Sequence, residues 1–241
     1  MKHLYITIAF LAFIFFSCSK DDNYSLGQNA QKAALVTIKK NNSSVGFYGE
    51  MDNQETIYIS KIHFNYTPRE GQRSIFYYSE YNQQIENYTY NAQIYSIENL
   101  LTDNVIKLKD QSISQYNTDP INITRAWYGG GYINIEFEIS ISNDNTQKSY
   151  INLIDSSTTI NNNNYELVLT HKREPKANKT NSLVKGFKCF KLNDIDANKI
   201  NISNYIIHYT SFDDVQRKFV IKIDESKSTL PLPSLLTEHL P

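Results

Sequence analysis

The 241-residue sequence has no charge bias and very little cysteine. Lysine and arginine together number 24 against 25 aspartate and glutamate residues, which gives a formal net charge of −1. We therefore do not expect a strongly basic surface for nucleic acid. The two cysteines are Cys18 and Cys189. So low a cysteine content excludes a disulfide-rich scaffold and a zinc ribbon built on Cys-x-x-Cys pairs.

The residues that are abundant favour β-structure. Hydrophobic residues make up 40% of the chain, and there are 18 tyrosines and 12 phenylalanines. Tyrosine, phenylalanine and isoleucine favour strands, and the many asparagines favour turns. This composition is rich enough in apolar residues to build a core, so disorder of the whole chain is excluded. The length predicts one or two domains.

The N-terminus carries an export signal. A short basic start, Met1-Lys2-His3, precedes an apolar run from Leu4 to Phe16. This pattern predicts a signal peptide over residues 1–17, since the run is too short for a transmembrane helix. The sequence Phe15-Phe16-Ser17-Cys18 resembles a bacterial lipoprotein lipobox. The resemblance implies cleavage before Cys18 and acyl chains on this residue, which would anchor the protein in a membrane. The alternative is a plain secretory signal that leaves Cys18 free.

A charged cluster follows Cys18 directly. The residues Ser19, Lys20, Asp21 and Asp22 resemble the surface-export signal of Bacteroidetes lipoproteins. The resemblance implies an outer membrane lipoprotein that faces the cell exterior; the alternative is a solvated spacer. The polar, unpatterned residues that follow predict a flexible tether over residues 18–32.

Beyond the tether the hydrophobic pattern has a period of two, which is typical of strands. Five strands are expected in the first part of the chain, at Ala34–Lys39, Val45–Met51, Thr56–Phe64, Ser74–Tyr81 and Tyr88–Ile97. The first two should form a hairpin, because a short polar link that contains Asn41-Asn42-Ser43-Ser44 joins them. Five strands in so short a stretch predict a small barrel. We place this barrel at residues 33–109.

Residues 107–124 mix turn formers and charges, so a domain boundary is expected there. The clearest strand is Ile133–Ile141, whose alternation predicts one buried and one solvated face. Further strands are expected at Ser149–Ile154, Tyr165–His171, Gly186–Leu192, Asn204–Tyr209 and Lys218–Ile223. Short strands at this spacing predict a β-sandwich over residues 112–224. Residues 225–241 contain three prolines, and we expect an extended tail.

The order of several short segments resembles a known family. These segments are Ala34–Lys39, Phe47–Asp52, Leu100–Thr102, Trp127–Phe137, Tyr150–Leu153 and Tyr165–His171. Together they resemble the NigD-like lipoproteins of Bacteroidetes. The resemblance implies an all-β fold, with an N-terminal OB-type barrel followed by a C-terminal antiparallel β-sandwich. The family name derives from a proposed role in bacteriocin immunity, and this role hardly constrains the mechanism. Membership of the family would therefore fix the architecture better than the activity.

No catalytic or metal-binding motif emerges. Glu136 and Glu138 share one strand face at roughly 6.5 to 7 Å, a spacing that could suit paired-carboxylate hydrolysis. A solvated strand face is the simpler interpretation of this pair. The histidines are scattered singly, so no metal site and no cofactor are expected. Cys189 has no expected disulfide partner once Cys18 is lipidated, which favours a buried, inert thiol.

Aromatic residues are the best candidates for ligand binding. Trp127, Tyr128 and Tyr132 flank the Gly129-Gly130-Gly131 turn, and such rings can stack on a sugar or a partner surface. The alternative is that Trp127 packs in the core. We therefore expect a non-catalytic, lipid-anchored surface protein that binds an extracellular protein or glycan, and not nucleic acid. The alternatives are an immunity-type protective lipoprotein and, less favoured, a surface hydrolase that uses Glu136 and Glu138.

Overall fold

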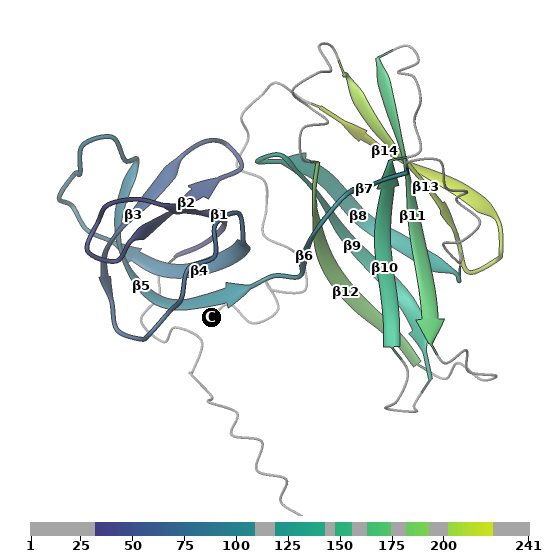
Figure 1. The fold of residues 1–241 in the computed structure, drawn as a ribbon, viewed down its shortest axis with the longest axis horizontal. Coiled ribbons are helices and arrows are strands. Elements are labelled where there is room, and N and C mark those ends of the chain that lie inside the picture. Colours follow the sequence, from purple (N-terminus) through teal and green to yellow (C-terminus); the bar gives the residue numbers. More distant parts are fainter. Residues whose placement is uncertain are drawn as a thin grey trace, which may run out of the picture.

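The computed structural model describes residues 32–108, 119–142, 148–155, 163–174, 182–192 and 202–223. All regular elements within these ranges are strands, joined into a barrel and two further sheets (Figure 1). No helix in the described parts is long and apolar enough to cross a membrane. The expected signal peptide, Cys18, the export signal at Ser19–Asp22 and the expected tail lie outside the described residues. So does the expected tether, except for its last residue, Lys32, which already belongs to the first strand.

The N-terminal domain is a closed barrel of five strands in the order β1-β2-β3-β5-β4. Its strands are β1 (Lys32–Lys40), β2 (Phe47–Met51), β3 (Thr56–Ile62), β4 (Arg73–Glu80) and β5 (Tyr90–Asn99). The expected hairpin of β1 and β2 is confirmed, since the two strands pair antiparallel. Strand β1 also pairs with β4, and β3 runs parallel to β5. The five expected strands and the barrel are therefore confirmed.

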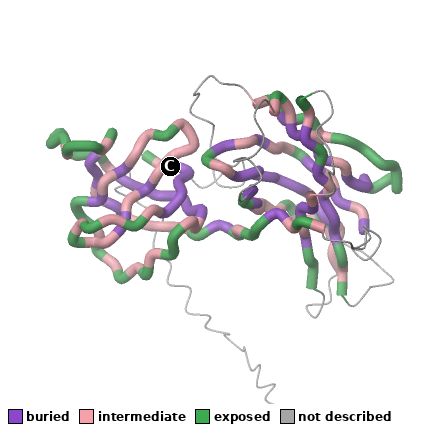
Figure 2. Tube along the Cα trace, turned by 45° about the horizontal axis from the view of Figure 1, so that its top comes forward, coloured by how far each residue is buried: buried purple, intermediate pink, exposed green. Residues whose placement is uncertain are grey.

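The C-terminal domain is a sandwich of two sheets, as expected. One sheet has the order β14-β13-β11-β10-β7 and the other the order β6-β12-β9-β8. The strands are β6 (Thr102–Asn104), β7 (Ile106–Lys107), β8 (Ile121–Gly129), β9 (Tyr132–Ile141), β10 (Lys148–Asp155), β11 (Asn164–Glu174), β12 (Ser182–Lys191), β13 (Asn204–Thr210) and β14 (Gln216–Lys222). Figure 2 shows buried residues along the strands of both domains.

The boundary between the domains falls earlier than residues 109–112. Strand β6 pairs with β12 and β7 pairs with β10, so both short strands belong to the sandwich. The chain therefore leaves the barrel after Asn99 and enters the sandwich at Thr102. Periodicity missed β6 and β7 because strands of three and two residues are too short to show alternation. It also missed β8, whose first residues fall inside the expected boundary segment.

The expected solvated face of β9 is wrong at two positions. Ile133, Ile135, Phe137 and Ile139 point into the sandwich core, as their alternation predicts. On the opposite face, however, Asn134 is 0% exposed and Glu136 is 3% exposed. Asn134 is covered at the side of the sandwich that meets the barrel, where it lies beside Arg73 (Figure 1), whereas Glu136 is covered beside Arg125 of the neighbouring strand β8. Alternation therefore located the core correctly but could not show that the second face is covered as well.

Candidate functional site

The two domains share an apolar cluster at their interface. Leu35, Ile75, Tyr77 and Leu100 come from the barrel and its exit, whereas Trp127, Tyr132 and Cys189 come from the sandwich. The indole ring of Trp127 stacks on the ring of Phe187, with centroids 5.6 Å apart. Burial of such a cluster stabilises the contact by removing apolar surface from water. The interface thus has an apolar core of its own, separate from those of the barrel and the sandwich.

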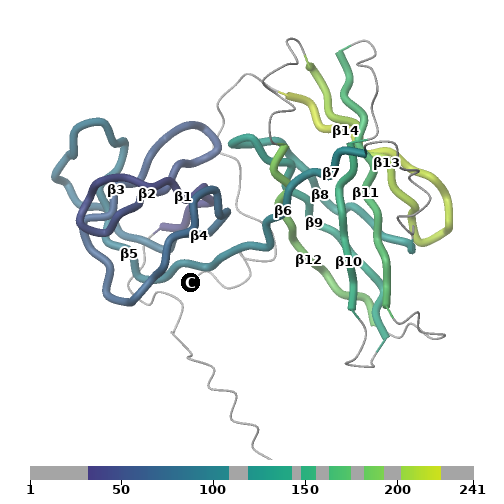
Figure 3. The backbone as a smooth tube through the Cα atoms, viewed as in Figure 1, coloured from purple at the N-terminus to yellow at the C-terminus, as the bar shows by residue number. Residues whose placement is uncertain are grey.

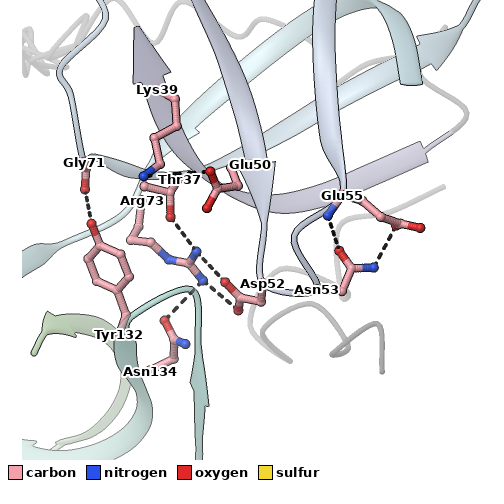
Figure 4. Close-up of polar contacts among 10 residues, drawn as sticks. All are labelled: Thr37, Lys39, Glu50, Asp52, Asn53, Glu55, Gly71, Arg73, Tyr132 and Asn134. Atoms are coloured by element: carbon pink, nitrogen blue, oxygen red, sulfur yellow. Dashed lines mark hydrogen bonds and ion pairs between the residues drawn. The ribbon is translucent and has the colours of Figure 1, made fainter. Parts of the chain in front are cut away.

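A buried ion pair lies at the edge of this interface (Figure 4). Arg73 Nη1 and Nη2 lie 2.6 and 2.9 Å from the two carboxylate oxygens of Asp52, and Nη1 also donates to Thr37 Oγ1 at 3.0 Å. The side chain of Arg73 is 0% exposed and that of Asp52 is 6% exposed. Burial alone disfavours the charged guanidinium, but the Asp52 carboxylate overcomes this cost and raises the pKa of Arg73. The barrel supplies both charges of this bidentate pair.

The sandwich closes over the ion pair with three kinds of contact. The Tyr132 ring centroid lies 5.0 Å from the Arg73 guanidinium carbon, and Asn134 Oδ1 lies 3.4 Å from Nη2. The β8–β9 turn provides the third contact, because a Cβ atom on Gly129 would lie 2.3 Å from Asp52 Oδ2. No side chain fits there, so Gly129 lets the backbone approach the carboxylate closely. The glycine run before β9 therefore serves domain packing.

The burial of two predicted ligand-binding aromatics contradicts that role. Trp127 is 6% exposed and Tyr132 is 2% exposed, and the Tyr132 hydroxyl donates to the Gly71 carbonyl at 2.7 Å. Tyr128 points the other way, into the sandwich, where its ring lies 5.3 Å from that of Tyr205. None of the three offers an open ring face beside the others. The apolar faces of these three rings pack against other residues of the protein instead.

The Glu136 and Glu138 carboxylates do not form an open pair. Glu136 Oε1 accepts a hydrogen bond from Arg125 Nη1 at 3.1 Å, and its side chain is 4% exposed. The Arg125 guanidinium in turn lies 4.6 Å from the Trp127 ring centroid. Glu138 is partly exposed at the next outward position of β9. Glu136 is thus held in the packing around Trp127, which leaves little of it for a substrate.

Two further side chains that could carry chemistry, Cys189 and His171, are each buried. Cys189 is a free, buried thiol, and burial raises its pKa to about 12. It is therefore protonated, as expected of an inert core cysteine. His171 is 0% exposed, and its Nδ1 lies 3.0 Å from the Pro120 carbonyl oxygen. Among the described residues, no group of three or more His, Cys, Asp or Glu side chains could hold a metal ion.

On the face that OB-type barrels commonly use for ligands, tyrosine side chains of the barrel contact one another. This face consists of β2, β3 and the loops between β1 and β2 and between β4 and β5. Here Tyr88 contacts Tyr48 and Tyr58, with ring centroids 5.3 and 5.0 Å apart. The Tyr88 hydroxyl accepts a hydrogen bond from Asn41 Nδ2 at 2.8 Å. The tyrosines therefore join the two loops to the strands.

An open pocket lies elsewhere on the barrel, at the end where the chain passes from β3 to β4. In Figure 3 this connection runs beside β5. The pocket has a volume of about 560 Å³, within the range of about 300–1,000 Å³ that is typical of small-ligand sites. Its lining residues are His63, Phe64, Asn65, Tyr66, Tyr95, Ser96, Ile97 and Asn99. We call it the barrel-mouth pocket.

A hydrogen-bond network fixes one wall of the barrel-mouth pocket. The hydroxyls of Tyr66 and Ser74 both donate to Asn99 Oδ1, at 2.7 and 2.8 Å. Burial raises the pKa of Tyr66 above its ordinary value of 10.0, so its hydroxyl stays protonated. The excess of tyrosine in the barrel was the available sequence signal for such a site. It could not single out Tyr66 and Tyr95, because Tyr77 and Tyr78 are each 4% exposed core residues.

These features define a two-domain, all-β protein in which an OB-type barrel packs on a β-sandwich through a shared apolar cluster, beside a buried ion pair of the barrel. Residues 35–100 match the NigD-like N-terminal OB domain, and residues 104–223 match the NigD-like C-terminal beta sandwich domain. The chain therefore belongs to the NigD-like family, as the order of its sequence segments indicated. A search of curated proteins gives no match.

Solved structures from related bacteria share the fold. A protein of unknown function from Bacteroides vulgatus is 18% identical with a TM-score of 0.69, over 87% of this chain and 99% of its own. A NigD-like immunity protein from Bacteroides caccae is 19% identical with a TM-score of 0.55, over 80% and 97%. A candidate lipoprotein from Bacteroides fragilis is 10% identical with a TM-score of 0.59, over 81% and 99%. At these identities the likeness shows the fold.

Proposed function

We propose that this protein is a non-catalytic, lipid-anchored surface protein that binds an extracellular protein or glycan in the barrel-mouth pocket. The observation that carries the proposal is the pocket itself, which combines a suitable volume with aromatic and amide side chains. The other aromatic clusters are closed by their own contacts: Trp127 lies on Phe187, and Tyr48 and Tyr58 contact Tyr88. The pocket is thus the best-supported place for a ligand.

The proposed anchor is Cys18, which follows the expected signal peptide. Acylation of this residue would hold the protein on the outer membrane, and Ser19–Asp22 would direct it to the outer face. The structural likeness to a candidate lipoprotein supports the anchor. A Cys18→Ala variant should leave the membrane fraction, whereas external protease should cleave the unaltered protein on intact cells. Protection from external protease would place it on the inner face instead.

Binding can be tested with the soluble chain 19–241, which contains every described strand. It should be screened against arrays of extracellular glycans and against proteins secreted by neighbouring strains. Ile97→Trp fills the barrel-mouth pocket and should weaken any specific ligand at least about tenfold, or roughly 1.4 kcal/mol. Tyr150→Ala is the matched control, since Tyr150 is an aromatic residue of the sandwich that is 44% exposed. The proposal would be refuted if the screen found no ligand, or found only ligands whose binding Ile97→Trp does not weaken.

A second candidate is an immunity-type role, in which the protein sequesters or blocks a toxic peptide at the envelope. The supporting observation is the shared fold with a NigD-like immunity protein. Deletion of the gene should then raise sensitivity to bacteriocins from sibling strains, and a copy that carries Cys18 should restore protection. Unchanged sensitivity after deletion would remove this candidate.

A further inference from the structure

We infer that the ligand of the barrel-mouth pocket is an uncharged carbohydrate, bound through the side-chain amide of Asn99. The inference rests on the proposed function, because it names the chemical class that the same pocket recognises. It follows from the charge of the lining, from the kinds of surface that the lining presents and from the way in which Asn99 is held.

The lining carries no permanent charge. None of its residues is Asp, Glu, Lys or Arg, and its ionisable side chains are those of His63, Tyr66 and Tyr95. A charged ligand that leaves water needs an opposite charge or several strong hydrogen bonds, and it is disfavoured without them. A phosphorylated, sulfated or uronic acid ligand would find no permanently cationic partner in this lining. An uncharged ligand does not need one.

The lining offers apolar faces and polar edges together. Phe64, Tyr66 and Tyr95 supply rings, whereas Asn65, Ser96 and Asn99 supply amides and a hydroxyl. A sugar ring has the same dual character, because its C–H groups form an apolar face and its hydroxyls form a polar rim. Aromatic side chains suit such a ligand since they combine apolar area with a polar tip. A purely apolar ligand would leave the amides without partners.

Asn99 is oriented to donate. Its Oδ1 atom already accepts the hydroxyls of Tyr66 and Ser74, and these two bonds fill the usual capacity of an amide oxygen. The two N–H groups on Nδ2 remain, and within the described residues they donate to no protein acceptor. A pre-oriented donor of this kind selects a ligand that presents acceptor oxygens, such as sugar hydroxyls. Ser74 is 0% exposed, so the support behind Asn99 is buried.

The substitution Asn99→Asp isolates this donor. An aspartate keeps an oxygen that accepts from Tyr66 and Ser74, but it replaces the free NH₂ group with a carboxylate oxygen. Binding of a neutral sugar should weaken at least about tenfold. Asn82→Asp is the matched control, because it introduces the same charge at an exposed position of the barrel outside the pocket lining. Thermal unfolding of both variants should match that of the unaltered chain.

The probes are a panel of neutral hexose oligosaccharides and a size-matched panel of oligouronates, titrated into the chain 19–241 by calorimetry. Binding of a neutral sugar that Asn99→Asp weakens and Asn82→Asp spares supports the inference. Preference for an oligouronate, equal loss in both variants, or a pocket that binds only a protein would overturn it, while leaving the proposed function intact. The proposed function would instead be refuted if no ligand of any class bound, or if Ile97→Trp weakened none of the ligands that did bind.

Discussion

The domain interface and the barrel-mouth pocket are made of the same kinds of side chain. Each places a tyrosine hydroxyl and an asparagine beside aromatic rings. At the interface, Tyr132 donates to the Gly71 carbonyl, and Asn134 is 0% exposed beside Arg73. At the pocket, Tyr66 and Ser74 orient Asn99, whose side chain borders open space. The difference lies in what covers these groups, and it separates a packing site from a binding site.

This comparison predicts that changes at the closed site will cost stability, whereas a change at the open site will cost binding. The largest effect is expected for Asp52→Ala, which leaves the fully buried Arg73 without its counter-charge. Removal of one partner of a buried pair costs about 3–5 kcal/mol of unfolding free energy. Urea denaturation measures it. The control is Glu80→Ala, in the exposed pair with Lys32, which should cost no more than about 1 kcal/mol.

The next largest effect is expected for Gly129→Ala. The added methyl group would lie 2.3 Å from Asp52 Oδ2, so the turn and the carboxylate must separate. Overpacking of this kind costs about 1–3 kcal/mol. If the contact is the cause, the same substitution should cost less in an Asp52→Ala background, and denaturation of all four proteins completes this double-mutant cycle. Strict additivity would contradict the close approach.

A closed site in the sandwich adds a pH dependence. Burial lowers the pKa of His171 from its ordinary value of 6.5, although Asp119 and the Pro120 carbonyl oppose this effect and Arg173 reinforces it. Below about pH 6.5 the unfolded chain therefore binds a proton that the folded chain does not bind. As the pH is lowered below about 6.5, the free energy of unfolding should decrease by up to about 1.4 kcal/mol per pH unit, until the pKa of His171 in the folded chain is reached.

Denaturation between pH 7 and pH 5 measures this slope. His171→Phe should reduce the slope. An undiminished slope in the His171→Phe variant would assign the pH dependence to other groups.

A smaller effect is expected for Tyr132→Phe. It removes the hydroxyl that donates to the Gly71 carbonyl at 2.7 Å and keeps the ring over Arg73. The loss of such a hydrogen bond costs about 0.5–1.5 kcal/mol. In Tyr81→Phe the lost bond to Gln93 is exposed, so its cost should be lower. Equal costs would indicate that water reaches the interface.

The smallest effect on stability is expected for Asn99→Asp. The variant keeps the acceptor for Tyr66 and Ser74, and exposed substitutions of this kind usually change stability by less than about 0.5 kcal/mol. A loss above about 1 kcal/mol in urea denaturation would mean that Asn99 is a structural residue. That result would remove the contrast between the open and the closed site.

Periodicity and motif order were sufficient for most of the fold. The barrel strands, the sandwich strands that have clear alternation and the family were all predicted from local patterns. The candidate site was not. Trp127 and Tyr132 were expected to bind a ligand but are buried, and Asn99 carried no signal that distinguished it from other asparagines. Exposure depends on contacts such as Tyr132 with Gly71, which are 61 residues apart in the chain.

The sequence by itself determined the all-β class, the barrel hairpin and the core face of β9, because strand alternation is set by neighbouring residues. Only the tertiary structure decided which polar groups are closed and which are open. In the sequence, Arg73 is only a charged residue of an expected strand. In the fold, Asp52 and the β8–β9 turn enclose it. Asn99 becomes an oriented donor only once Tyr66 and Ser74 take its oxygen. Both outcomes depend on desolvation and hydrogen bonding between distant segments, which no local pattern records.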